Sequence, residues 1–311
     1  MNGSRRRLAR RATPLAAPDQ WQPARPLDAI PGPVLRLCAR VALAPEQRAA
    51  LAAAVAPLGP DDWDLLLRLA QRHGLAPLAF KHLAESGLLS AAPAAVAGAL
   101  KAAYVQSLVA NRIAWDELAA CLAALERAGV AAIPFKGVLL AARCYGVLAL
   151  RPTADLDLLI QPADLARAEA AIRSTGYEPQ PGWARRLDDE VLRFRVLQFA
   201  KADAPPIELH LSLVRLPVYR LGLADAVIWG GARTIEVAGL RARSLDQGDE
   251  LRYLSAHYVA QHGGERLLWL ADIAALVAAL PPTWDWEAFI ARLAALRMAS
   301  PALAALRLAA A

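Results

Sequence analysis

The chain has 311 residues, of which 57% are hydrophobic, and a formal net charge of +6, so it can hold one large domain or two smaller ones. No stretch of 18 residues is free of charged side chains, which excludes a predicted membrane-spanning helix. The three cysteines contain no C-x-x-C pair, which argues against a disulfide framework or a zinc knuckle and favours the cytoplasm.

Positive charge is concentrated at the N-terminus. The first dozen residues include Arg5, Arg6, Arg7, Arg10 and Arg11. No apolar run of a signal peptide accompanies them, and the segment up to Pro33 is rich in proline and alanine. We therefore predict a disordered basic lead-in over residues 1–33. A tail that binds nucleic acid is the alternative, which is not favoured because no zinc finger, helix-turn-helix or aromatic RNA-binding motif is present.

Residues 34–129 have the apolar spacing of helices and no strand pattern. Asp61 and Asp62 precede an amphipathic run, as acids do at a helix start. Pro93 to Leu108 and Asn111 to Ala128 are predicted as separate helices, the second of which stops at Gly129. We expect a helical N-terminal region.

The period changes at residue 130. Val130 to Phe135 is short and apolar, which predicts a strand, and Val138 to Tyr145 is typical of a helix. Lys136 and Gly137 lie between them. A glycine before a helix start lets a phosphate approach the backbone, and the lysine supplies positive charge. This signal is weak by itself because the motif is neither a P-loop nor G-x-G-x-x-G.

Two acids follow in an apolar run. Asp155 to Ile160 is predicted as a strand, in which Asp155 and Asp157 point to the same face. Two neighbouring carboxylates need a compensating cation, and Mg²⁺ prefers such oxygen ligands. The alternative is an exposed strand end with two solvated acids, since D-x-D is a short pattern.

Later segments add a third acid. Pro162 to Thr175 is predicted as a helix, and Arg193 to Ala200 and Ile207 to Leu213 as paired strands. In the second strand Glu208 and His210 share one face, where Glu208 either completes a metal site or lies on the solvated face of an edge strand. Residues 246–311 are predicted to be helical, and the spacing of His257 and His262 does not suit two metal ligands on one helix face.

Taken in order, these motifs resemble a family of bacterial nucleotidyltransferases in the DNA polymerase β-like superfamily. The resemblance runs from about Trp63 to Phe289, and these segments carry it: Phe135-Lys136-Gly137, Asp155-Leu156-Asp157, Ile207-Glu208-Leu209-His210, Tyr145, Arg151-Pro152, Gly176-Tyr177 and Leu268-Trp269-Leu270-Ala271-Asp272. The resemblance implies an α+β fold with a small mixed sheet over residues 130–245, between helical regions at 34–129 and 246–311. Val138 departs from the superfamily, which usually has serine or glycine after the motif glycine.

The resemblance also implies a function, namely transfer of a nucleoside monophosphate from an NTP such as ATP to a hydroxyl acceptor, with release of pyrophosphate. The acceptor class (small molecule, peptide or protein) stays open. The implied catalytic residues and ligands of Mg²⁺ or Mn²⁺ are Asp155, Asp157 and Glu208; the implied phosphate-binding residues are Lys136, Gly137 and Arg151, with His210 on the acceptor side.

Two further functions remain open. A non-catalytic member that binds a nucleotide or a partner, in a toxin–antitoxin or peptide-maturation setting, is favoured by Val138 and disfavoured by the three acids. An enzyme that modifies RNA ends through the arginine-rich tail is the other.

Overall fold

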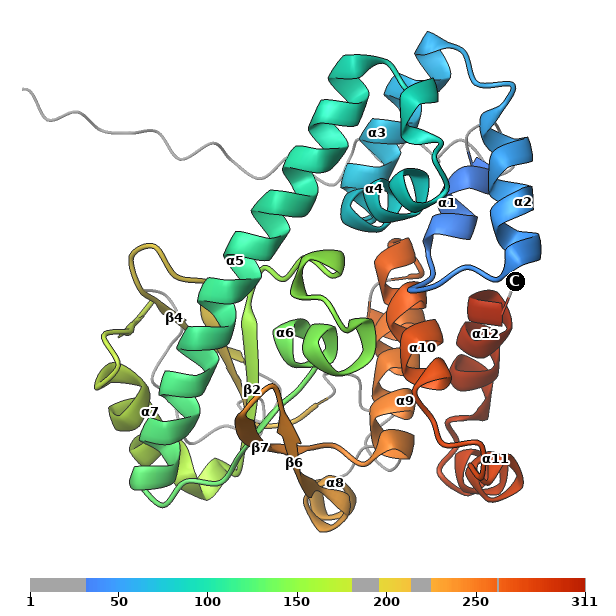
Figure 1. Ribbon diagram of the computed structural model, residues 1–311. Helices are drawn as coiled ribbons and strands as arrows, with labels where there is room; N and C mark the ends of the chain where they lie inside the picture. Colours follow the sequence, from blue (N-terminus) through green and yellow to red (C-terminus); the bar gives the residue numbers. More distant parts are fainter. Residues whose placement is uncertain (1–31, 181–195, 214–224, 262, 311) are drawn as a thin grey trace, which may run out of the picture.

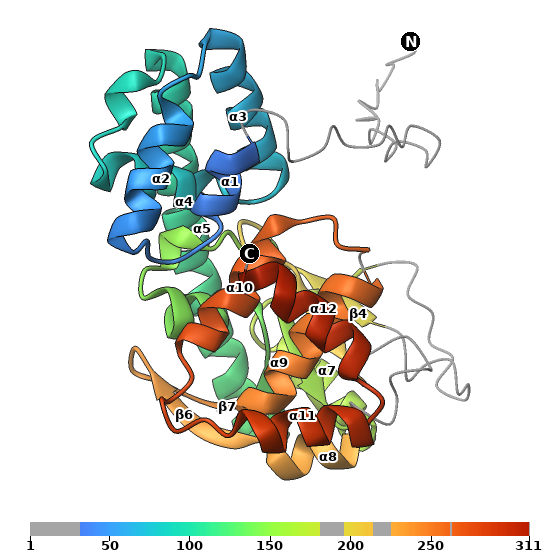
Figure 2. The ribbon, with the colours of Figure 1, turned by 90° about the vertical axis from the view of Figure 1, so that its right-hand side faces the viewer.

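The computed structural model describes residues 32–180, 196–213, 225–261 and 263–310. These residues form an α+β fold in which helical regions flank a small mixed sheet (Figures 1 and 2), as predicted. The N-terminal arginines, residues 193–195 and His262 lie outside the described residues. Among the described helices, none combines the length and the apolarity that a membrane span requires.

The N-terminal region is helical from Gly32 onward. Its elements are α1 (Gly32–Cys38), α2 (Pro45–Val55), α3 (Pro60–Arg72), α4 (Ala76–Glu85), the short 3-10 turn η2 (Leu89–Ala91) and α5 (Ala94–Arg127). Proline opens α2 and α3, where its missing N–H costs nothing. The acid predicted to favour the start of α3 caps it, because the Gly59 amide donates to Asp62 Oδ2 at 3.0 Å.

Helix α5 is one unbroken helix of 34 residues, so the predicted separation into two helices is wrong. No proline or glycine occurs between residues 99 and 128, and Val109 and Ala110 continue the helix. Gly129, at φ 67°, ends it as predicted. At about 1.5 Å per residue, α5 is long enough to run from the N-terminal helices to the sheet (Figure 1).

The central sheet has the strand order β1-β2-β5-β4-β3. Its strands are β1 (Ala132–Pro134), β2 (Leu156–Ile160), β3 (Glu178–Pro179), β4 (Val196–Ala200) and β5 (Ile207–His210). Strands β2 and β5 are parallel, whereas the other pairs are antiparallel. The predicted pairing of β4 with β5 is therefore confirmed for the described residues. Helix α5 and helix α7 (Leu165–Arg173) pack together over this sheet.

A second, two-stranded sheet was not predicted. After α8 (Asp225–Gly231), the strands β6 (Arg233–Val237) and β7 (Leu240–Ser244) form a hairpin. Ala238 and Gly239 make its two-residue turn, with φ values of 47° and 78°. Such a turn needs positive φ at both positions, which alanine rarely adopts, so the sequence signal was weak.

The C-terminal region contains α9 (Gln247–Ala256), a π-helical turn (His257–Gln261), α10 (Leu267–Ala278), α11 (Trp286–Ala295) and α12 (Ala299–Ala310). These helices lie beneath the N-terminal helices and beside the sheet (Figures 1 and 2). The two terminal regions share one hydrophobic core, to which Leu78 and Leu268 both belong, whereas a second core fills the space between the sheet, α7 and the C-terminal half of α5.

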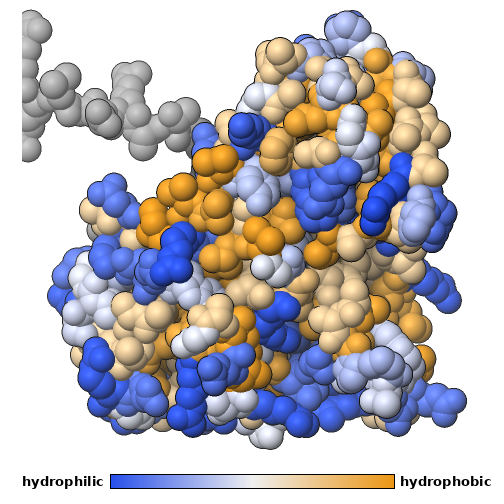
Figure 3. Space-filling model, in the orientation of Figure 1, coloured by the Kyte–Doolittle hydropathy of each residue, from blue (hydrophilic) through white to orange (hydrophobic). Residues whose placement is uncertain are grey.

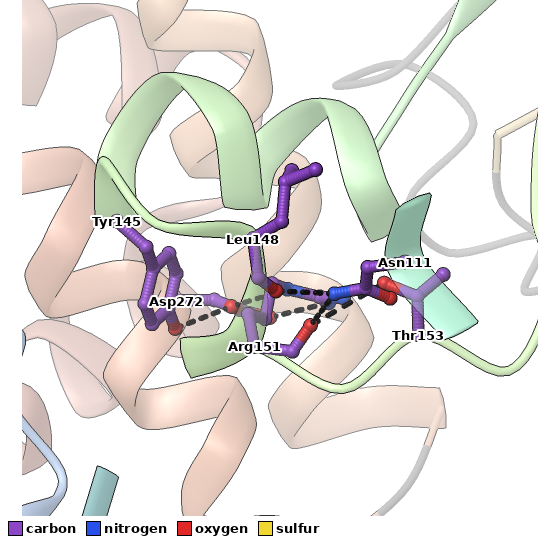
Figure 4. Close-up of polar contacts among 6 residues, drawn as sticks. All are labelled: Asn111, Tyr145, Leu148, Arg151, Thr153 and Asp272. Atoms are coloured by element: carbon purple, nitrogen blue, oxygen red, sulfur yellow. Dashed lines mark hydrogen bonds and ion pairs between the residues drawn. The ribbon is translucent and has the colours of Figure 1, made fainter. Parts of the chain in front are cut away.

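A buried polar junction joins the three regions (Figure 4). Asp272 of α10 accepts from Arg151 Nε at 2.7 Å and Nη2 at 2.8 Å, and Tyr145 Oη donates to it at 2.7 Å. The amide of Asn111, in α5, donates to the carbonyls of Leu148 at 2.5 Å and Arg151 at 2.7 Å. The segment between β1 and β2 is thus held from both sides.

Candidate active site

Two carboxylates meet where β2 and β5 run side by side. The parallel register places Asp157 directly opposite Glu208, so both side chains lie on the same face of the sheet. Leu156 and Leu158 point to the other face and are buried in the second core. The structure therefore brings Asp157 and Glu208 together, although they are far apart in the sequence. The alternation of polar and apolar residues along each strand turns both acids to the same face.

His210 joins these two acids. Its Nε2 lies 2.8 Å from Asp157 Oδ1 and 3.5 Å from Glu208 Oε2. Gln198, opposite Glu208 on β4, donates to Glu208 Oε1 at 2.8 Å. One ligand atom from each of Asp157, Glu208 and His210 falls within 4.8 Å of the others, so the three side chains form a group that could hold a metal ion.

Lys136 and Gly137 form a strained turn beside the acids. Lys136 has φ 49° and ψ −146°, and Gly137 has φ 51°. Side chains rarely adopt such a backbone, and the surroundings must stabilise it against a cost of about 1–3 kcal/mol. Lys136 Nζ lies 3.0 Å from Asp157 Oδ1. A Cβ at Gly137 would lie 3.4 Å from Thr153 Cγ2 and 3.5 Å from the Asp155 carbonyl, so the turn packs closely against the segment that carries the acids.

Asp155 lies just before β2, at the edge of this group. Its side chain is only partly buried, and a small pocket brings it together with Lys136, Gly137 and Asp157. Burial and the neighbouring charge of Asp157 raise the pKa of Asp155 to about 6. It stands beside the cluster that Asp157, Glu208 and His210 make.

The remaining charges are strongly coupled. Burial opposes the charge on Asp157, but Lys136 and the hydrogen bond from His210 outweigh it and lower the pKa of Asp157 to about 2. Burial likewise opposes the charge on Lys136, yet Tyr253, Asp157 and Asp155 raise its pKa. The hydrogen bond from His210 lowers the pKa of Glu208. The site is therefore a compact array of opposite charges.

The structure pairs Arg151 with Asp272 of α10. Its guanidinium is buried and makes the bidentate ion pair with Asp272. The Nε and Nη2 groups of Arg151 are thereby occupied, and its contact with a phosphate stays a prediction. An arginine before a proline carries no sequence signal that separates a ligand contact from an ion pair with an acid 121 residues later.

A model of the family described as "Uncharacterised nucleotidyltransferase" matches residues 59–311, well over half of the chain. The chain belongs to this nucleotidyltransferase family. The predicted family, and with it the assignment to the transferases, is confirmed. A comparison with curated protein sequences found no match.

Two solved structures are similar to the chain. The antibiotic-resistance factor ANT(2'')-Ia is 15% identical, with a TM-score of 0.41 and coverage of 61% of this chain and 94% of its own. An antigenic nucleotidyltransferase-like protein from Paracoccidioides brasiliensis is 15% identical, with a TM-score of 0.37 and coverage of 61% and 91%.

One residue near the candidate active site comes from the C-terminal helices and was not predicted from the sequence. Tyr253, on α9, is buried and packs edge-on against Phe135, with ring centroids 5.2 Å apart. Phe135 in turn contacts the His210 ring at 5.0 Å. Burial raises the pKa of Tyr253 above its usual range, and the nearby charge of Lys136 opposes that shift. All residues of α9 from Gly248 to Ala256 are buried, so helical periodicity gave no face from which to choose Tyr253.

Proposed function

We propose that this chain is a divalent-metal-dependent nucleotidyltransferase that moves a nucleoside monophosphate from an NTP to a hydroxyl acceptor and releases pyrophosphate. The observation that carries the proposal is the pairing of Asp157 with Glu208 across two parallel strands, next to the Lys136–Gly137 turn. Membership of a nucleotidyltransferase family supports the same chemistry.

The residues present fit a metal ion. Within the described residues, Asp157 Oδ2 is buried and has no hydrogen-bond partner. A buried carboxylate oxygen without a donor is costly unless a cation binds to it. We assign Asp155, Asp157 and Glu208 to Mg²⁺ or Mn²⁺, both of which favour carboxylate oxygens. When bound, such an ion neutralises negative charge on the triphosphate.

The side chains of this site have separate tasks in the transfer. Lys136 places a positive charge where a phosphate would approach Gly137, whose missing side chain leaves the backbone accessible. The acceptor oxygen forms a bond to the α-phosphorus of the NTP. The bond between the α-phosphorus and the oxygen that leaves with pyrophosphate breaks. Glu208 accepts the proton of the acceptor hydroxyl or completes the metal site. His210 holds Asp157 and Glu208 in position and borders the acceptor side.

A second candidate is a family member that binds nucleotide without transferring it. Val138 favours this function, because its side chain is buried in the second core and supplies no hydroxyl for a phosphate. If the protein is an active transferase, its acceptor is a small molecule, a peptide or a protein. If it only binds nucleotide, no acceptor is needed. Location in the cytoplasm belongs to the proposal as well.

Pyrophosphate release tests the proposal. The protein is incubated with each of the four NTPs, Mg²⁺ or Mn²⁺, and pooled small-molecule and peptide acceptors. The double variant Asp155→Asn/Asp157→Asn should abolish release, whereas Asp203→Asn, the same change at an exposed position between β4 and β5, should leave it unchanged. Turnover that persists in the double variant would refute the assignment of these acids. Calorimetric binding of a non-hydrolysable NTP without turnover would support the second candidate.

A further inference from the structure

Helix α5 carries an exposed apolar stripe at its middle. Four of its large apolar side chains are exposed, namely Val105 (47%), Leu108 (40%), Val109 (55%) and Ile113 (39%). They are half of the large apolar side chains that are exposed in the described part of the chain. Figure 3 shows the corresponding patch along α5. A contiguous apolar patch on a folded surface is typical of an interaction site.

The stripe lies on the side of α5 that this chain does not use. Val105, Val109 and Ile113 are four residues apart, so they follow one another along a single helix face. The opposite face holds the side chains that pack against the rest of the molecule, among them Asn111 and Trp115, which are buried. None of the four stripe residues belongs to either hydrophobic core or packs against one.

Charged residues at the two ends of the stripe indicate what covers it. Lys101 lies eight residues before Val109, and Asp116 lies seven residues after it, and both are exposed. In a parallel helix pair each of these charges would lie opposite its own copy, which is repulsive. In an antiparallel pair centred on Val109, Lys101 lies within one residue, about 1.5 Å along the axis, of Asp116 in the other helix.

We propose that a second copy of this chain packs on the stripe through an antiparallel pair of α5 helices, related by a two-fold axis at Val109. Val105 of each copy then lies opposite Ile113 of the other, and Val109 meets its own copy at the axis. Such a self-complementary surface is what a two-fold dimer requires. The apolar side chains supply the affinity, and the two Lys101–Asp116 pairs select the orientation.

Asp116 is available for this role. Within its own helix it pairs with Arg112, with 2.8 Å between Asp116 Oδ1 and Arg112 Nη2, and both side chains are well exposed. An exposed pair at this spacing contributes little to the stability of a helix. Asp116 can therefore bind Lys101 of the second copy while it keeps Arg112 at its side.

Sedimentation equilibrium of the full chain over a range of concentrations tests the proposal. The wild-type protein should form a dimer in the micromolar range, and Val109→Glu should make it monomeric, because two carboxylates would meet at the axis. The control is Ile290→Glu, a change to the same residue at an exposed position of α11. A wild-type monomer at about 100 μM, or a dimer that survives Val109→Glu, would overturn the proposal. So would co-sedimentation of the monomer with lipid vesicles that Val109→Glu abolishes.

The orientation has its own test. Lys101→Glu and Asp116→Lys should each raise the dimer Kd by roughly 2- to 10-fold, and the two together should restore most of the affinity. Val109→Cys in a Cys144→Ser background should form an intermolecular disulfide on mild oxidation, whereas Ile290→Cys in that background should not. A charge swap that fails to restore the dimer, with no disulfide at Val109, would refute the antiparallel arrangement.

Discussion

Removal of the charge on Asp272 should be among the most destabilising isosteric changes in this protein. The carboxylate is fully buried and accepts three hydrogen bonds, two from Arg151 and one from Tyr145 (Figure 4). Asp272→Asn leaves the guanidinium of Arg151 charged, buried and without its counter-ion. Breaking a buried ion pair from one side costs about 3–5 kcal/mol. We expect a loss of unfolding free energy in that range, measured from urea transitions followed by circular dichroism and tryptophan fluorescence.

Three matched variants separate the ion pair from its surroundings. Tyr145→Phe removes one hydrogen bond to a charged group and should cost about 1.5–3 kcal/mol. Arg151→Met combined with Asp272→Leu and Tyr145→Phe replaces all three polar partners by apolar side chains and should recover most of the loss. Glu85→Gln breaks the exposed Lys81–Glu85 pair and should cost no more than about 0.5 kcal/mol.

The reasoning fails on either of two results. A loss below about 1 kcal/mol for Asp272→Asn would mean that water or another group compensates Arg151, since an unpaired buried charge costs several times more. A triple variant as unstable as Asp272→Asn would mean that packing, and not charge, sets the cost at this junction.

Three further predictions concern the site and pH. Lys136→Ala should lower kcat for pyrophosphate release by about 10²–10³, as loss of one group that stabilises transition-state charge does; an unchanged kcat would remove Lys136 from the phosphate site. Tyr253→Phe keeps the ring contact with Phe135 and should lower kcat by about 10-fold while the urea midpoint stays unchanged; a shifted midpoint with full activity would make the hydroxyl purely structural. Burial lowers the pKa of His82, whose Nε2 lies 2.7 Å from the Arg40 carbonyl, below its usual value near 6.5. The unfolded chain therefore binds a proton that the folded chain excludes, so stability falls as pH drops below about 6.5, and His82→Gln should flatten that slope in urea titrations. Equal slopes in the two proteins would contradict the assignment to His82.

The acidic pair was predictable because strand geometry has a short period. In a segment that alternates polar and apolar residues, one face is fixed by the core on the other side, so Glu208 had to point away from Ile207 and Leu209. The same alternation places His210 beside Glu208. The alternation does not predict which residue of the adjacent strand lies opposite Glu208. The match of Asp157 with Glu208 depends on the register of β2 against β5, which only the folded sheet defines.

The length of α5 was misjudged for a different reason. Residues 109 and 110 carry no stop signal, yet the buried apolar face of α5 changes direction along the helix. Its first half buries Val96 and Leu100 in the core shared by the terminal regions, and its second half buries Leu118 and Leu125 in the core beneath the sheet. A helix that serves two cores has no single apolar face, so its periodicity resembles that of two separate helices.

Polar partners that are far apart in the sequence could not be predicted, because local spacing does not determine which side chains meet in the folded chain. Arg151 and Asp272 were both noted as family features, but nothing in local spacing pairs an arginine after β1 with an acid in α10. A second ion pair, between Arg143 Nη1 and Glu250 Oε2 at 2.9 Å, also joins the segment after β1 to the C-terminal helices. Tyr253 reaches the acidic site from the same helix as Glu250. These contacts join the C-terminal helices to the segments that carry Lys136 and the acids. The predicted domain boundary at residue 245 therefore stays a prediction.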